Sequence, residues 1–199
     1  MSEPVDFWFD PICPWTWATA RWLDQAARVR PIAPRWHLMS LAVLNAERWS
    51  GTAEGRDRAL VSRQAGRVMA AAQKAGGQAA LRRVYFSFGP RAFDAGRRIA
   101  GPGELDVLAE SLAEAGLPPG LIDAADSTEF DAAVEASHAA GTALVGPDVG
   151  SPIVAALGAA FFGPVVSPAP RGEAAGRLWD AWAALAAVPG VYELKRSRP

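Results

Sequence analysis

The segment from Asp6 to Trp22, DFWFDPICPWTWATARW, contains Cys13, the single cysteine of the chain. An apolar run of strand length, from Val5 to Phe9, stops at Asp10-Pro11, and a helix is predicted to follow at once. Pro14 suits the first helical position, because the N–H that proline lacks would have no partner there. Cys13 is therefore predicted to be the N-cap of this helix.

A cysteine at a helix N-cap is placed where a thiolate is favoured. The N-cap side chain meets the N–H groups of the second and third helical residues, here Trp15 and Thr16, and the helix dipole adds positive charge. The sequence thus predicts a Cys13 pKa below the value of about 8.5 that free cysteine has. The Thr16 hydroxyl has the spacing to donate to the sulfur but forms no disulfide with it. In the alternative interpretation, Cys13 is a small buried hydrophobic residue.

Composition excludes several classes of function. The 199 residues are 50% hydrophobic and carry a formal net charge of −1, which predicts a folded chain without a nucleic-acid or membrane partner. The N-terminus, MSEPVDFWFD, lacks the pattern of a signal peptide, so a cytoplasmic location is expected. Two histidines and one cysteine supply no metal-ligand cluster, and no phosphate-binding loop motif is present. Neither a metal nor a nucleotide cofactor is therefore expected.

Hydrophobic periodicity gives the order of elements along the chain. The first helix is predicted over Pro14–Val29, and a strand parallel to the first over Arg35–Leu41, with Asn45 in the turn that follows. Residues 52–140 are helical in pattern and are interrupted at Gly76-Gly77. A hairpin over Ile153–Phe162 and a helix over Gly172–Ala187 end the chain. The predicted order is βαβ, a helical insertion, then ββα, with 1–50 and 145–199 forming one domain and 51–144 an inserted subdomain.

The order of these elements, with Cys13-Pro14 at the start of the first helix and Ser151-Pro152 before the third strand, resembles the α/β thioredoxin fold in its DsbA-like form. The likeness is greatest to the actinobacterial DsbA-like group that includes the mycothiol-dependent nitroreductases. It extends over nearly the whole chain, in the stretches DFWFDPICPWTWATARW, HLMSLAVLN, VGPDVGSPIVAALGAAFFGPV, PRGEAAGRLWD and ELKR. The resemblance implies a cis peptide bond at Ser151-Pro152, facing the thiol.

One difference from these relatives changes the chemistry. Where redox-active members have Cys-Pro-Trp-Cys, this chain has Cys13-Pro14-Trp15-Thr16, so a mixed disulfide on Cys13 has no internal thiol to resolve it. The resemblance then implies a monothiol oxidoreductase that uses mycothiol or glutathione as co-substrate. Its nucleophile is Cys13 and Thr16 stabilises the thiolate. The residues expected to bind the thiol or line the acceptor side are Pro14, Trp15, Trp17, Asn45, Ser151 and Pro152.

Two other functions stay open at this point. Kappa glutathione transferases and 2-hydroxychromene-2-carboxylate isomerases resemble this architecture and hold the sulfur of glutathione with one hydroxyl or thiol, without a covalent step. A degenerate domain without catalysis would instead use its tryptophans to bind an aromatic ligand or a protein. Whether the second substrate is an aromatic or an electrophilic molecule, and whether the chain forms a homodimer, also stay open. The tryptophans expected in the core are Trp8, Trp22, Trp36, Trp179 and Trp182. His37 is expected to be a hydrogen-bonded structural residue in a central strand.

Overall fold

A four-stranded mixed sheet forms the centre of the computed structural model, which describes residues 2–97 and 103–197. The strands lie in the order β2-β1-β3-β4, with β1 and β2 parallel and the other pairs antiparallel. They are β1 (Glu3–Phe9), β2 (Ile32–Leu38), β3 (Ile153–Ala156) and β4 (Ala159–Phe162). The predicted order of elements, βαβ and later ββα, is confirmed.

Strand β2 differs from its prediction in position and in its bounds. It begins at Ile32 instead of Arg35, contains Pro34, and lies at an edge of the sheet instead of its centre. An edge strand accepts proline, because one side of its backbone has no strand to bond. His37 is therefore on an edge strand, and its expected hydrogen bond is present, with Nε2 2.6 Å from Oδ1 of Asp6.

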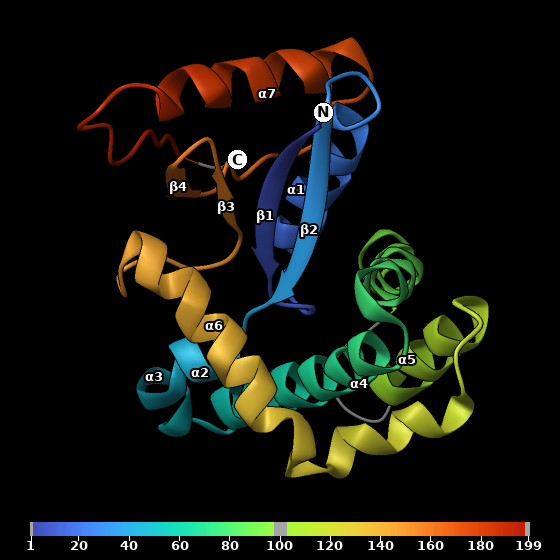
Figure 1. The fold of residues 1–199 in the computed structure, drawn as a ribbon. Coiled ribbons are helices and arrows are strands. Elements are labelled where there is room, and N and C mark those ends of the chain that lie inside the picture. Colours follow the sequence, from blue (N-terminus) through green and yellow to red (C-terminus); the bar gives the residue numbers. More distant parts are fainter. Residues whose placement is uncertain (1, 98–102, 198–199) are drawn as a thin grey trace.

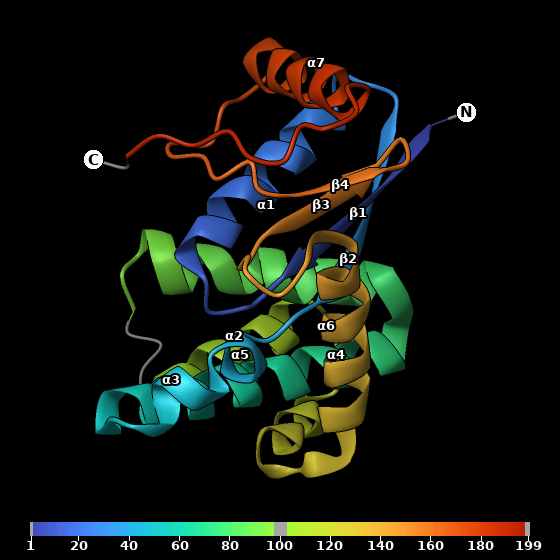
Figure 2. The ribbon, with the colours of Figure 1, turned by 90° about the vertical axis from the view of Figure 1, so that its left-hand side faces the viewer.

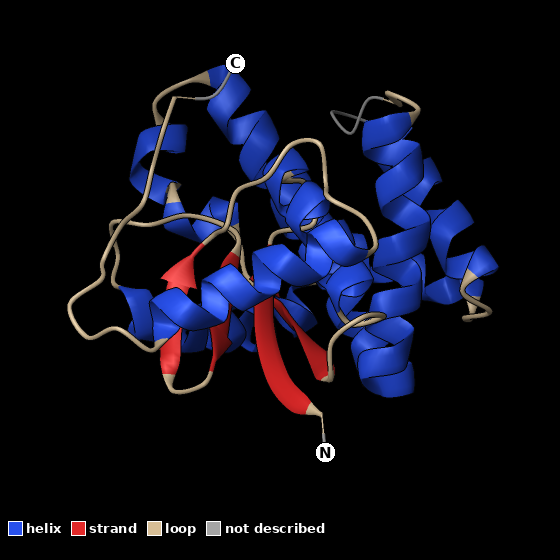
Figure 3. Cartoon of the chain, turned by 90° about the horizontal axis from the view of Figure 1, so that it is seen from above, coloured by secondary structure: helices blue, strands red, loops and turns tan. Residues whose placement is uncertain are grey.

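Helices cover both faces of the sheet. On one face, α1 (Pro14–Ala26) packs against α7 (Glu173–Ala186), and the Trp22 indole N–H donates to the carbonyl of Ala175 at 3.0 Å. Seen from above, α7 crosses over the strands (Figure 3). On the other face, α6 (Asp131–Val145) approaches so closely that a Cβ at Gly141 would lie 2.8 Å from the Trp8 ring.

The inserted helices gather at one end of the sheet, below the strands in Figures 1 and 2. In chain order they are α2 (Leu41–Leu44), α3 (Ala46–Ser50), α4 (Ala53–Gly89), a π-helical turn (Pro90–Asp94), α5 (Gly103–Glu114), two 3-10 turns (Pro119–Asp126 and Thr128–Phe130) and α6. This is the end of β1 from which the chain enters the Cys13 turn. No helix within residues 2–97 and 103–197 combines the length and apolarity needed to cross a membrane.

Helix α4 contains the predicted interruption as a kink. Gly76 and Gly77 leave helical geometry, and Gly77 has a φ of 66°, which favours glycine. Directly after the kink, the Gln78 amide accepts from the N–H of Trp36 at 2.7 Å and donates to its carbonyl at 2.8 Å. The side chain of Gln78 thus pairs the backbone of edge strand β2, which would otherwise be open.

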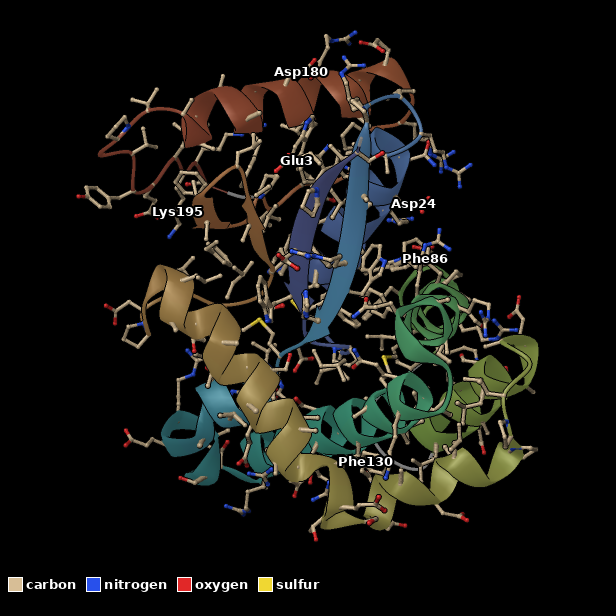
Figure 4. All side chains as sticks on the ribbon, in the orientation of Figure 1. Glu3, Asp24, Phe86, Phe130, Asp180 and Lys195 are labelled. Atoms are coloured by element: carbon tan, nitrogen blue, oxygen red, sulfur yellow. The ribbon has the colours of Figure 1, made fainter. Side chains whose placement is uncertain are left out.

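The main hydrophobic core joins the sheet to the second half of α4. Phe9 of β1 stacks on Tyr85 at 4.1 Å between ring centroids, and Trp36 meets Phe86 edge-on at 5.3 Å. Figure 4 shows Phe86 between this half of α4 and the sheet. The division of the chain into 1–50 with 145–199 and 51–144 stays a prediction, because this core continues across it.

Candidate functional site

Cys13 occupies the predicted position at the start of α1. Its N–H donates to the carbonyl of Asp10 at 3.2 Å, which closes the turn after β1, and its backbone is extended, with φ −85° and ψ 113°. Pro14 is the first residue of α1, and the N–H of Trp17 donates to the carbonyl of Cys13 at 3.1 Å. The prediction that Cys13 is the N-cap residue is therefore confirmed. The residue as a whole is 7% exposed.

The loop before β3 faces this thiol through Ser151. The Ser151-Pro152 peptide bond is cis, as the family resemblance implied, and Cys13 Sγ lies 3.9 Å from the carbonyl oxygen of Ser151. The Ser151 hydroxyl accepts from the N–H of Asp10 at 3.1 Å and pairs with the Thr16 hydroxyl at 2.6 Å. Asp10, Cys13 and Thr16, which lie close together in the sequence, thus meet a loop about 140 residues further along the chain.

The expected lowering of the Cys13 pKa is wrong for this state of the protein. Burial raises the pKa of the thiol, while the Thr16 hydroxyl and the N–H groups of Thr16 and Trp15 lower it. The charge of Asp10 raises it further. The helix N-terminus supplies the donors that the sequence predicted, but the sulfur accepts no cap hydrogen bond and the cost of desolvation is larger. Burial thus favours the neutral form of the Cys13 thiol, and its Sγ lies near the carbonyl oxygen of Ser151.

Asp10 is a buried acid that the sequence alone did not reveal as a site residue. Its side chain is 0% exposed. Oδ1 accepts from the N–H of Ile12 at 2.8 Å, and Oδ2 accepts from the N–H of Leu41 at 2.6 Å and from the Ser62 hydroxyl at 2.7 Å. Burial raises the pKa of Asp10 to about 6, against the effect of these three donors. Asp10 therefore ties the thiol turn to the start of α2 and to α4.

The remaining predicted site residues have different surroundings. Trp15 is half-buried at the second position of α1. Trp17 is 3% exposed and packs so closely on Gly89 that a Cβ there would lie 2.5 Å from its ring. Trp17 thus packs between α1 and α4, and its role on the acceptor side stays a prediction. The Asn45 amide donates to the carbonyl of Leu41 at 2.9 Å, so it is used within its own turn.

Three of the four tryptophans within Asp6–Trp22 are buried, and the fourth, Trp15, is half-buried. Trp8, Trp17 and Trp22 are all buried. The expectation that Trp8, Trp22, Trp36, Trp179 and Trp182 belong to the interior is confirmed. An apolar groove between α4 and α6 has Phe130, labelled in Figure 4, as an aromatic lining residue, and neither Cys13 nor any tryptophan lines it. The buried tryptophans give no support to aromatic-ligand binding beside Cys13.

Comparison with known sequences gives one family and one curated relative. A family model described as Rv2466c-like, mycothiol-dependent nitroreductase Rv2466c, matches residues 12–196. The uncharacterized protein Rv2286c of Mycobacterium tuberculosis is 31% identical over 206 residues, which cover 98% of this chain and 82% of that protein.

Three solved structures share the fold at low sequence identity. A probable DsbA oxidoreductase, SCO1869 from Streptomyces coelicolor, has a TM-score of 0.61 at 16% identity and covers 98% of this chain and 94% of its own. A 2-hydroxychromene-2-carboxylate isomerase has a TM-score of 0.60 at 16% identity, with coverages of 92% and 94%. The cytosolic disulfide reductase DsbM from Pseudomonas aeruginosa, solved with GSH, has a TM-score of 0.55 at 19% identity, with coverages of 91% and 99%. The predicted DsbA-like thioredoxin fold is confirmed.

Proposed function

Since the chain belongs to the Rv2466c-like family of mycothiol-dependent nitroreductases and is a thiol-dependent oxidoreductase of the DsbA-like type, we propose that it works with one thiol, Cys13, and a low-molecular-weight thiol as its partner. Mycothiol is the first candidate for that partner, from the family description, and glutathione the second. The observation that carries the proposal is the opposition of Cys13 to the Ser151-Pro152 bond, with Thr16 bonded to Ser151 where redox-active relatives have a second cysteine.

The proposed cycle is thiol–disulfide exchange in two steps. The Cys13 thiolate attacks a disulfide RS–SR′, so that a Cys13–SR bond forms, the S–S bond of the substrate breaks, and R′S⁻ leaves and takes up the proton that Cys13 lost. A second thiol, RSH, then attacks the SR sulfur, releases Cys13 and forms RS–SR. The net reaction converts RS–SR′ and RSH into RS–SR and R′SH, so electrons and protons balance across it. Without a cysteine at position 16, the second thiol has to come from outside the chain.

The residues around the thiol have separate parts in this exchange. Thr16 and the N–H groups at the start of α1 stabilise the thiolate as it forms, against the cost of burial. The Ser151 oxygen accepts from the N–H of Asp10, so the Ser151 hydroxyl is able to donate its own proton to the oxygen of Thr16. The proton of the Thr16 hydroxyl then remains available for Cys13 Sγ. The backbone of Ser151, next to Pro152 and the start of β3, offers the incoming thiol an extended segment to pair with.

Intact-mass spectrometry tests the covalent step. After incubation with oxidised glutathione or oxidised mycothiol, the protein is expected to gain the mass of one thiol unit on Cys13, and the gain is expected to disappear on treatment with a reductant. The Cys13→Ser variant serves as the control and is expected to gain nothing. Absence of the adduct in the unmodified protein, under conditions where a small-molecule thiol of similar accessibility reacts, would refute the covalent mechanism.

A second candidate function is supported by the protonation state of Cys13. A neutral thiol that is raised in pKa by burial can donate a hydrogen bond to the sulfur of a bound thiol cofactor without attacking it. The fold is shared with the 2-hydroxychromene-2-carboxylate isomerase structure, although a likeness at 16% identity shows the fold alone. In this case reduced glutathione or mycothiol binds in calorimetry, no adduct forms, and Cys13→Ser, which keeps a donor, retains the binding.

A further inference from the structure

Ser62 is a buried serine in the first half of α4 that the proposed exchange does not use. It is 1% exposed, and its hydroxyl donates to Oδ2 of Asp10 at 2.7 Å and accepts from the N–H of Ala42 at 3.2 Å. Its oxygen also lies 3.4 Å from Oγ of Ser40. Among residues 2–97 and 103–197, every side-chain hydrogen bond of Ser62 therefore leads out of its own helix.

A buried serine inside a helix often bonds to the backbone of that helix instead. Ser111 in α5 is an example, because it is fully buried and its hydroxyl donates to the carbonyl of Val107, four residues earlier, at 2.6 Å. Ser62 reaches from α4 to the turn that carries the thiol, 52 residues earlier in the chain. A hydrogen bond to an ionised carboxylate is stronger than one to a neutral carbonyl, so the contact with Asp10 is the main one that this hydroxyl makes.

Asp10 connects Ser62 to both halves of the thiol site. Its N–H donates to the Ser151 hydroxyl at 3.1 Å, and its carbonyl accepts from the N–H of Cys13 at 3.2 Å. All three groups bonded to its carboxylate are donors, so the carboxylate is satisfied in its ionised form. Two of these donors are backbone N–H groups. The hydroxyl of Ser62 is the third, and it is the one that a substitution removes.

We propose that Ser62 is a positioning residue for the thiol site, which acts on Cys13 through Asp10. Its hydroxyl keeps the Asp10 carboxylate ionised and bonded to α4, while the backbone of Asp10 holds the Cys13 turn against Ser151. The proposal rests on the proposed function, in which Cys13 is the reacting thiol, and it adds a contribution from the inserted helices to the reactivity of that thiol.

Loss of the Ser62 donor is expected to move the titration of Asp10 and, with it, the reactivity of the thiol. Burial raises the pKa of Asp10 to about 6, against the effect of its three donors. A hydrogen bond to a charged group is strong enough to move a pKa by about one unit, so Ser62→Ala should raise the pKa of Asp10 to about 7. Between these two values fewer molecules of Ser62→Ala carry the Asp10 charge, which disfavours the Cys13 thiolate.

Tyr85 and His138 also face this network of hydrogen bonds. Tyr85, on the second half of α4, keeps its proton, because burial above all raises its pKa well above the ordinary value. His138, on α6, accepts from the N–H of Ser40 at 3.4 Å, and burial lowers its pKa from 6.5. Both groups are present in every variant of the test below, so they add no difference between those variants.

The test is the alkylation rate of Cys13 by iodoacetamide, measured from about pH 5 to about pH 9 in the unmodified protein, in Ser62→Ala and in the matched control Ser111→Ala. A neighbouring like charge moves a pKa by about one unit, so Ser62→Ala is expected to react about two- to threefold faster near pH 6.5. At about pH 5 and about pH 9 Asp10 has the same charge in both proteins, and equal rates are expected. Ser111→Ala should match the unmodified protein throughout.

The Asp10→Asn background shows whether the effect passes through Asp10. There, Ser62→Ala is expected to leave the pH profile of alkylation unchanged, because the group that titrates is gone. The proposal would be overturned by a Ser62→Ala rate that equals that of the unmodified protein at every pH. A rate displaced by the same factor at every pH, or an equal effect with and without Asp10, would overturn it as well.

A second measurement covers the case in which Ser62→Ala folds poorly. In the unmodified protein, the NMR signal of the Ser62 hydroxyl proton, which burial shields from exchange, is expected to shift as Asp10 titrates at about pH 6 and to stop doing so in Asp10→Asn. A hydroxyl signal that ignores the titration of Asp10 would contradict the proposal. Neither measurement needs a low-molecular-weight thiol, so failure of the proposed function, seen as a missing adduct, is distinguishable from failure of this inference.

Discussion

Replacement of Thr16 by cysteine is expected to convert the protein from a one-thiol into a two-thiol protein. Position 16 is in the first turn of α1, and its side chain is fully buried beside Ser151 and Cys13. Intramolecular thiols reach effective concentrations far above those of free thiols. A mixed disulfide on Cys13 should therefore collapse to an internal disulfide with the introduced thiol at least about 1,000-fold faster than an external thiol at millimolar concentration would release it. The measurement is intact mass against time after reaction with oxidised glutathione.

Thr16→Ser is the matched control for this experiment. It keeps a hydroxyl near Ser151 and adds no thiol, so its adduct on Cys13 is expected to last as long as that of the unmodified protein. In Thr16→Cys the adduct should vanish and leave a protein two hydrogen atoms lighter than its reduced form. A long-lived adduct in Thr16→Cys would show that the two sulfurs do not meet, and that position 16 does not have the geometry of a resolving cysteine.

Asp10→Asn is expected to change how stability depends on pH. Folding raises the pKa of Asp10 from 3.8 to about 6, so the folded state favours the protonated acid. The corresponding stabilisation is fully present below pH 3.8 and is lost as the pH rises through about 6. Relative to Asp10→Asn, the free energy of unfolding of the unmodified protein should therefore fall by about 2 kcal/mol between about pH 4 and about pH 7.

Urea unfolding of both proteins at several pH values across this range measures the difference. The asparagine side chain places an N–H group against one of the three donors, and this contact destabilises Asp10→Asn by an amount that does not change with pH. The test is therefore the change with pH of the difference in free energy of unfolding. The same substitution at the exposed Asp148 controls for the loss of one carboxylate. The free energy of unfolding of the unmodified protein, minus that of Asp10→Asn, is expected to fall as the pH rises. A value that stays constant or rises with pH would contradict a raised pKa at Asp10.

Local signals in the sequence predicted most of the scaffold. Pro14 after a strand and an Asp-Pro break placed the start of α1 correctly, and the Gly76-Gly77 pair marked the kink of α4. The predicted bounds of β2 were displaced, because the strand begins at Ile32 and contains Pro34, which its edge position tolerates. These predictions depend on neighbouring residues, which a sequence displays directly.

The electrostatics of the site could not be predicted in the same way. The donors around Cys13 follow from helix geometry, but the desolvation that outweighs them depends on residues that fold over the thiol from elsewhere. Asp10 looked like a turn residue, and its role appears only when Leu41 and Ser62 reach it across 31 and 52 residues. Tyr85 lies within the predicted helical residues 52–140, where nothing in the sequence marks its hydroxyl. Its unpaired hydroxyl is a property of the packed structure.

Release of the Cys13 adduct tests most directly the claim that this site needs an external thiol to finish its reaction. Protein loaded with glutathione on Cys13 is freed of excess reagent, and its mass is followed at increasing concentrations of reduced glutathione or mycothiol. The expected result is a stable adduct without free thiol, and a release rate proportional to the thiol concentration when it is added. Release at the same rate in the absence of any free thiol would contradict a one-thiol site that depends on an external partner.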